Sequence, residues 1–214
     1  MLNSKIGAFF ALATLVAANP LERRTATNVF PKPPTTSSLS KPITVKAGQT
    51  FTPPTAYTRY DRGSGACNGQ SEGGDADAVF LLEEGATLSR VVIGPNQSEG
   101  VHCLVIQHNG GGTVIVNSFY VEDFGKLYRS CGNCGTQYTR HVQINDVWAV
   151  NGKNLAGINT NYGDTAKIRT TKVSSVSSIC DKYTGNNSGK EPTKTGSGPD
   201  SQYCLYSTSD ITSA

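Results

Sequence analysis

The chain has 214 residues, with 19 Lys and Arg against 16 Asp and Glu, and its formal net charge is only +3. A charge this small gives no general basic field, so it offers no argument for nucleic acid as a partner. The length suits one domain with a full hydrophobic core.

Residues 1–18 have the features of a secretory signal peptide. Lys5 precedes an apolar run, and the small residues Ala17 and Ala18 follow it. The run is too short to cross a bilayer, and no later segment comes close to the required length. We therefore predict a secreted, extracellular protein with no membrane partner.

Two segments separate this leader from the predicted domain. Residues 19–24 end in Arg23-Arg24, which is typical of a dibasic pro-peptide site, although two solvated arginines in a flexible tail would look the same. Residues 25–41 are rich in Pro, Ser and Thr and predict a disordered lead. The domain is expected over residues 42–214.

The cysteines indicate disulfides. All six follow the leader: Cys67, Cys103, Cys131, Cys134, Cys180 and Cys204. An even number in an oxidising compartment favours disulfides over a redox C-x-x-C pair or a zinc site. We expect Cys180 and Cys204 to form a C-terminal clasp. His102, His108 and His141 have no metal-ligand spacing and are predicted to be hydrogen-bonded structural side chains.

Four similar segments predict a repeating fold. They begin at Leu88, Val116, Ile144 and Ile168, so the spacings are 28, 28 and 24 residues. Solenoid repeats fall in this range, whereas a sandwich has turns every ~8–12 residues. The chain is rich in Gly, Asn, Thr and Val, with almost no helical periodicity.

The predicted fold is therefore all-β, a right-handed parallel β-helix with one coil per repeat. A β-sandwich with accidental internal similarity is the alternative. The side chains expected to face inward are Leu88, Val91, Val116, Phe119, Ile144, Val147 and Ile168.

A pair of cations follows one of these repeats. Lys126 and Arg129 come after "NSFYVEDFG" and run directly into a C-x-x-C pair, which is expected to hold their loop. Loops of neighbouring coils project from one face of a solenoid, so such charges can line one solvent-exposed groove. Ammonium and guanidinium groups suit a carboxylate-bearing polymer. A solvated charge cluster without a role is the simpler alternative.

Several longer motifs carry a family resemblance. "GACNGQSEGGDADAVFLLEEGATLSRVVIGPNQSEGVHC", "QHNGGGTVIVNSFYVEDFGKLYRSCGNC", "LAGINTNYGDTA" and "NNSGKEP" closely resemble the secreted pectate lyases of polysaccharide lyase family 3, of the fungal type. The resemblance covers about residues 42–212. It implies a compact right-handed parallel β-helix that cleaves polygalacturonate (pectate) in pectin by calcium-dependent β-elimination, giving 4,5-unsaturated oligogalacturonates. A monomer is expected.

The resemblance also implies site residues. Lys126, Arg129 and Glu72 match catalytic or cleft positions, and Lys126 and Arg129 would also bind substrate. The family's proposals include arginine as the base, yet a guanidinium is very hard to deprotonate, so Lys126 is the easier proton acceptor. Glu99 matches a calcium-ligand position, and Asp123 is added as a second ligand.

Tyr162 is a further candidate for binding substrate. Its ring would stack on a sugar, and the alternative is an aromatic residue buried in a turn.

The chain departs from the family at one place. Only "LVI" separates Cys103 from Gln107, where family members carry an acidic W-E-D-x-x-E-D-A-like motif and then a lysine. The missing segment amounts to roughly two coils and most of the expected calcium carboxylates. The alternatives to an active lyase are a catalytically impaired pectate-binding relative and a truncated gene product.

Overall fold

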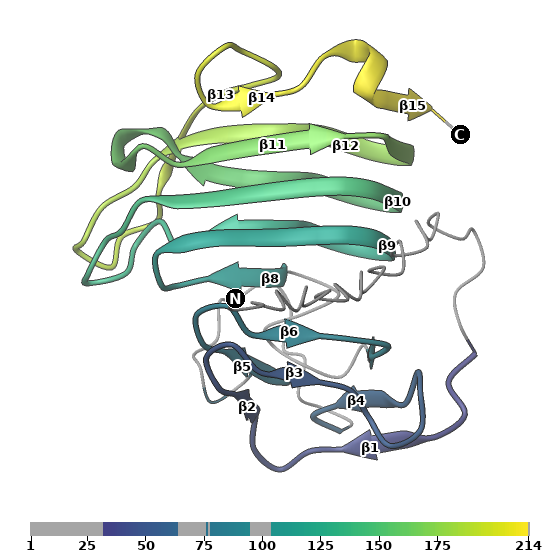
Figure 1. The fold of residues 1–214 in the computed structure, drawn as a ribbon. Coiled ribbons are helices and arrows are strands. Elements are labelled where there is room, and N and C mark those ends of the chain that lie inside the picture. Colours follow the sequence, from purple (N-terminus) through teal and green to yellow (C-terminus); the bar gives the residue numbers. More distant parts are fainter. Residues whose placement is uncertain (1–31, 64–75, 77, 95–103, 214) are drawn as a thin grey trace, which may run out of the picture.

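The structure is a computed structural model that describes residues 32–63, 76, 78–94 and 104–213 (Figure 1). Among these residues, no helix is long and apolar enough to cross a membrane. Two 3-10 turns, η2 (Thr160–Tyr162) and η3 (Thr208–Asp210), interrupt the strands. In chain order the strands are β1 (Thr36–Ser38), β2 (Ile43–Val45), β3 (Thr50–Phe51), β4 (Arg59–Asp61), β5 (Phe80–Leu82), β6 (Thr87–Leu88), β7 (Val92–Ile93), β8 (Leu104–His108), β9 (Gly112–Ser130), β10 (Arg140–Asn159), β11 (Thr165–Arg169), β12 (Thr171–Thr184), β13 (Thr193–Ser197), β14 (Cys204–Leu205) and β15 (Ile211–Ser213).

The strands stack in parallel along one axis (Figure 1). Upstream, β1 pairs with β4 and β4 with β7, while β2 pairs with β5 and β3 with β6. Downstream, β8 to β15 form one eight-stranded sheet in which only β13 is antiparallel, to β12. The pairing confirms the predicted parallel β-helix. Its first strand, β1, lies inside the segment that the sequence predicts to be a disordered lead.

Each coil turns at residues with a left-handed backbone, which residues other than glycine seldom adopt. Two rows of these corners run along the downstream coils: Ser118, Asp146 and Thr170 in the first, and Asp123, Asn151 and Ser175 in the second. The Ser118 hydroxyl donates to Asp146 at 2.8 Å, and the Asn151 amide donates to Asp123 at 2.6 Å. The first row repeats at 28 and 24 residues, which confirms these two spacings of the period predicted from the sequence.

Apolar ladders fill the downstream coils. Val116, Ile144 and Ile168 lie side by side in register on β9, β10 and β11, and all three are buried. Full burial of each such side chain stabilises the fold by roughly 1.5–3 kcal/mol. Val147 is buried as well.

Three predicted inward residues are only partly buried: Leu88, Val91 and Phe119. They flank a break in the stack. Among the described residues, β6 and β7 pair only with upstream strands, and β9 has β8 as its upstream neighbour only along its last five residues. Within the described ranges, no paired strand from the other side of the break covers these side chains.

Two disulfides fix the ends of coils. Cys180 bonds to Cys204, which confirms the predicted clasp, and Cys131 bonds to Cys134. Cys67 and Cys103 lie outside the described residues. These bonds agree with the even cysteine count and restrain the chain where it leaves the strands.

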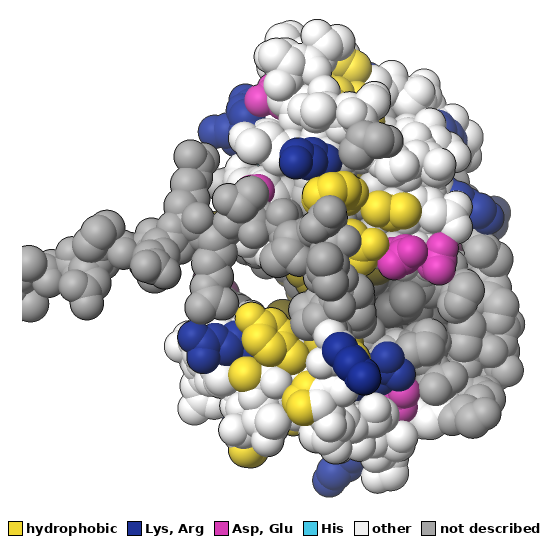
Figure 2. Space-filling view, turned by 90° about the vertical axis from the view of Figure 1, so that its right-hand side faces the viewer, with side chains coloured by type: hydrophobic (Ala, Val, Ile, Leu, Met, Phe, Trp, Pro, Cys, Tyr) yellow, Lys and Arg dark blue, Asp and Glu magenta, His cyan; other side chains and the backbone are white. Residues whose placement is uncertain are grey.

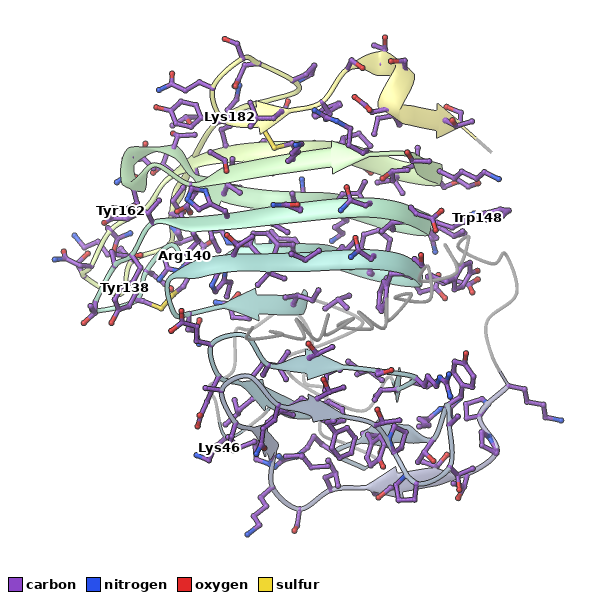
Figure 3. The ribbon with its side chains drawn as sticks, viewed as in Figure 1. Lys46, Tyr138, Arg140, Trp148, Tyr162 and Lys182 are labelled. Atoms are coloured by element: carbon purple, nitrogen blue, oxygen red, sulfur yellow. A yellow bond between two sulfur atoms is a disulfide. The ribbon has the colours of Figure 1, made fainter. Side chains whose placement is uncertain are left out.

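A buried arginine organises the loops between coils. Arg140 is fully buried, and its guanidinium donates to the backbone oxygens of Asn109, Gly110, Cys131 and Tyr138 at 2.7–3.2 Å. Figure 3 shows Arg140 at the loop end of the solenoid, near Tyr138 and Tyr162. Because these hydrogen bonds satisfy its charge, Arg140 has a structural role.

The two described histidines are structural, as predicted. His108 Nδ1 lies 2.8 Å from the Tyr128 hydroxyl, and His141 Nδ1 lies 2.7 Å from the Thr165 hydroxyl. Burial lowers the pKa of His108, so its ring is neutral near pH 7. His102 lies outside the described residues.

Candidate active site

The two predicted cations lie on the last segment of β9, after the corner at Asp123. Register places Lys126 beside Asn154 of β10, and it places Arg129 beside Gly157 of the same strand. On the other side, Gln107 of β8 pairs with Arg129. The candidate site is therefore built across neighbouring coils.

Arg129 is buried, with 2 % of its surface exposed. Its Cζ atom lies 4.1 Å from the centroid of the Tyr183 ring. Among the described residues, no carboxylate forms an ion pair with Arg129, and its buried Nη1 atom has no hydrogen-bond partner. The sequence prediction of a solvent-exposed Arg129 is thus wrong, because a tyrosine from a distant segment covers it.

A charge in this state is unusual. Buried charges are normally paired, since removing them from water without a partner is costly. Arg140 in the same protein is satisfied in the usual way, because Nε, Nη1 and Nη2 each donate a hydrogen bond to a backbone carbonyl. Arg129 has no such set of carbonyl partners at Nη1 among the described residues.

Further unpartnered polar atoms lie on the strands that flank β9. Within the part of the chain that the structure describes, the buried Oε1 atom of Gln107 has no hydrogen-bond partner, and neither do Oδ1 and Nδ2 of Asn154. Gln107 is the register neighbour of Arg129, and Asn154 is that of Lys126. Buried polar groups are satisfied in the great majority of cases, so this group is suited to a polar ligand or to water.

A second polar group supports Tyr183. Asp181 is 5 % exposed and accepts hydrogen bonds from the Ser178 hydroxyl at 2.7 Å and from Lys194 Nζ at 2.8 Å. The Tyr183 hydroxyl lies 3.5 Å from the other Asp181 oxygen. Burial raises the pKa of Tyr183, the charge of Arg129 opposes this rise, and the charge of Asp181 adds to it. The phenol is therefore neutral near pH 7.

The other predicted residues are placed as follows. Lys126 is partly buried, and Tyr162 is partly buried within η2, where its ring packs against Gly185. Asp123 is exposed at its corner and bonded to Asn151. Glu72 and Glu99 lie outside the described residues.

The described residues do not by themselves fit a calcium ion. Asp123 is the one predicted ligand they include, and one of its oxygens already accepts the Asn151 amide. Within the described ranges, no group of three or more His, Cys, Asp or Glu side chains is placed to hold a metal. Calcium takes ~6–8 oxygen ligands, so further ligands would have to come from elsewhere.

Another cation–aromatic pair lies elsewhere on the solenoid. Lys172 Nζ is 4.9 Å from the centroid of the Trp148 ring. Trp148 lies at the right-hand side of Figure 3, and Figure 2 shows the molecule from that side. Hydrophobic, basic and acidic side chains alternate on that face (Figure 2). This mixture of charges does not favour an anionic polymer, so the Arg129 region remains the candidate site.

Sequence reasoning missed Gly157, Asp181 and Tyr183 as neighbours of Arg129. The repeat contained the necessary signal for two of them. Adding one period of 28 to Arg129 gives Gly157, and adding the next of 24 gives Asp181, as the register shows. Tyr183 lies two residues further along β12.

Comparison with known proteins identifies the family. The model of the pectate lyase family matches residues 27–104 and 104–190. Pectate lyase H of Emericella nidulans is 47% identical over 189 residues, covering 69% of this chain and 72% of that protein. Probable pectate lyase D of Neosartorya fischeri is 42% identical over 221 residues, covering 83% and 90%. Pectate lyase E of Emericella nidulans is 42% identical over 248 residues, covering 92% and 94%.

Solved structures share the fold. The catalytic domain of pectate lyase PelI from Erwinia chrysanthemi superposes with a TM-score of 0.61 at 21% identity, covering 82% of this chain and 99% of that domain. PelI in complex with tetragalacturonic acid gives a TM-score of 0.57 at 21% identity, covering 80% of this chain and 70% of PelI. This likeness supports the β-helix fold.

The comparisons also locate the missing segment. Alignments of 221 and 248 positions are longer than the 214-residue chain, so they contain positions that this chain lacks. The family match breaks at Leu104, which confirms the internal loss predicted between Cys103 and Gln107. With relatives this similar along most of its length, the chain belongs to the pectate lyase family.

Proposed function

We propose that this chain acts on polygalacturonate by β-elimination and that the Arg129 guanidinium pairs with a uronate carboxylate. The observation that carries the proposal is the buried Arg129 charge, which has no anionic partner among the described residues. An arginine fork matches a carboxylate in geometry and charge. The related fold of PelI was crystallised with tetragalacturonic acid.

The reaction makes specific demands on these side chains. A base removes the proton on C5, which lies next to the uronate carboxyl group, and Lys126 is the side chain we assign to this step. The electrons of the C5–H bond form a C4–C5 double bond while the C4–O bond breaks. The leaving oxygen takes a proton from water. Arg129 stabilises the negative charge that spreads onto the carboxylate during proton removal.

Calcium dependence is proposed from the family resemblance, with Glu99 and Asp123 as carboxylate ligands and Glu72 in the cleft. Bound calcium would neutralise the uronate and stabilise developing negative charge. No step above depends on it. Tyr162 is proposed to contact the polymer beside the cations.

The remaining proposals concern the setting in which the chain works. Residues 1–18 would direct secretion, residues 19–24 would be removed as a pro-peptide, and the residues after them would lead to the domain, whose first strand is β1. The secreted protein would act as a monomer on pectin outside the cell.

The second candidate function is a pectate-binding relative with little turnover. The break at Leu104 favours it, because it removes coils next to the strand that pairs with Arg129. The polymer would then bind without being cleaved at an appreciable rate. We expect this chain to release product far more slowly than an intact relative.

The test measures the absorbance of the 4,5-unsaturated uronate, first with excess Ca²⁺ and then with a chelator. Slow product release that Arg129→Ala abolishes, while Lys46→Ala on the surface leaves it unchanged, supports the lyase proposal. Binding of oligogalacturonate without product supports the second candidate. Rapid, chelator-sensitive turnover would show that the missing coils are dispensable, and no binding at all would refute both functions.

A further inference from the structure

We infer that Tyr183 and Gly157 are positioning residues that hold the Arg129 guanidinium in place for an anionic substrate. The inference rests on the proposed function and extends it to two residues on neighbouring coils. Neither residue has a charge at neutral pH, so both would act through Arg129.

Gly157 provides the space in which the guanidinium lies. A Cβ atom at this position would lie 3.3 Å from both Cδ and Nη1 of Arg129 and 3.4 Å from a ring carbon of Tyr183. Contacts of 3.3 Å are tighter than carbon atoms normally tolerate. A side chain at residue 157 would therefore push Arg129, Tyr183 or both out of their present positions.

Tyr183 defines the orientation of the guanidinium. Nη1 donates no hydrogen bond to a described residue, so the Tyr183 ring, whose centroid lies 4.1 Å from Cζ, is the contact that we expect to hold the guanidinium. Guanidinium groups stack on aromatic faces and can still donate hydrogen bonds at their edges. The stack thus leaves the donor edge available for a carboxylate.

The ring itself is held from its far end. Its hydroxyl lies 3.5 Å from Asp181, which is fixed by Ser178 and Lys194. The contact is long, so the ring face is expected to matter more than the hydroxyl. Loss of the ring should therefore harm the function of Arg129 more than loss of the hydroxyl alone.

The experiment compares four variants of the full chain. Tyr183→Leu removes the ring, Tyr183→Phe keeps it, and Gly157→Ala fills the space. Tyr138→Leu is the matched control, because Tyr138 also lies near an arginine, Arg140, whose position is fixed by backbone carbonyls. Each variant is measured for unsaturated product and for binding of tetragalacturonate, and thermal unfolding checks that it is folded.

Displacing a catalytic group by about 1 Å can cost ~100-fold in rate, so Tyr183→Leu should lower kcat/KM at least about tenfold. Gly157→Ala should lower it less, because its Cβ contacts require a shift of only a few tenths of an ångström. Most of the loss should lie in kcat. Tyr183→Phe should stay within about threefold, and Tyr138→Leu should be unchanged. In an Arg129→Ala background, Tyr183→Leu should not weaken the binding of tetragalacturonate any further. If the chain binds but does not cleave, the affinities of the variants for tetragalacturonate should fall in the same order as the expected kcat/KM values.

The outcomes separate the inference from the proposed function. If Arg129→Ala leaves both turnover and binding unchanged, the proposed function fails. If Arg129→Ala is damaging but Tyr183→Leu behaves like Tyr138→Leu, the positioning role alone is refuted. The positioning role is also refuted if Tyr183→Leu weakens tetragalacturonate binding equally in the wild-type and Arg129→Ala backgrounds, because Tyr183 would then act independently of Arg129.

Discussion

The carboxylate of Asp164 accepts a hydrogen bond from the backbone N–H of Arg140 at 2.9 Å and so ties the start of β10 to the start of the next coil. The same buried carboxylate accepts the backbone N–H of Asn159 at 2.9 Å and the hydroxyl of Ser130. Both ends of β10 and the end of β9 therefore share one acceptor. Such a residue should matter for stability rather than for substrate binding.

Asp164→Ala should destabilise the fold by about 3 kcal/mol or more, because several buried donors lose their acceptor at once. Urea unfolding measures the change. Glu83→Ala is the control, since Glu83 is exposed and forms a surface pair with Lys46, and its loss should leave stability nearly unchanged. Similar losses in the two variants would contradict the structural role of Asp164.

Gly152→Ala should cost about 1–3 kcal/mol through overpacking. A Cβ atom at Gly152 would lie 2.1 Å from a ring carbon of Phe124, which is itself buried. Combining it with Phe124→Leu should recover part of the loss in chemical unfolding. Gly135→Ala is the control, because a Cβ there meets nothing within 4 Å. An additive double variant would argue against the contact.

The two disulfides should contribute unequally to stability. Replacing Cys180 and Cys204 together by alanine should lower the free energy of unfolding by about 3 kcal/mol, because their bond closes a loop of 24 residues. The Cys131–Cys134 bond spans only three residues and should contribute less. Denaturant unfolding of both double variants tests the order, and a larger loss at Cys131 and Cys134 would reverse the argument.

Asp200 should make stability depend on pH in the acid range. Burial tends to raise its pKa, but hydrogen bonds from Lys182 and from the backbone of Tyr203, Gln202 and Cys204 outweigh burial and hold the pKa well below its usual value of 3.8. A folded-state pKa below the unfolded one stabilises the fold above the unfolded pKa, and this stability is lost as pH falls.

Asp200→Asn should therefore lower stability at pH 7 and have a smaller effect at about pH 2, where the unfolded carboxyl is protonated. Unfolding at both pH values checks this. An effect of equal size at the two pH values would show that the carboxylate charge is not responsible.

The period of the solenoid was determined by the sequence alone. Parallel coils hydrogen-bond along their whole length, so Val116, Ile144 and Ile168 must recur at nearly constant spacing to stay in register. The cysteine count indicated the Cys180–Cys204 clasp, and the resemblance to the family indicated the loss between Cys103 and Gln107. These features can be read from the sequence because they depend only on the positions of residues along the chain.

Only the tertiary structure decided that Arg129 is buried. Its environment depends on the Tyr183 ring of β12 and on the space left by glycine at position 157 of β10, and these two residues belong to different coils. The repeat places Gly157 next to Arg129, but it does not specify that Tyr183 turns its face onto the guanidinium. Exposure depends on which side chains cover a group in three dimensions, and a one-dimensional period does not contain that information.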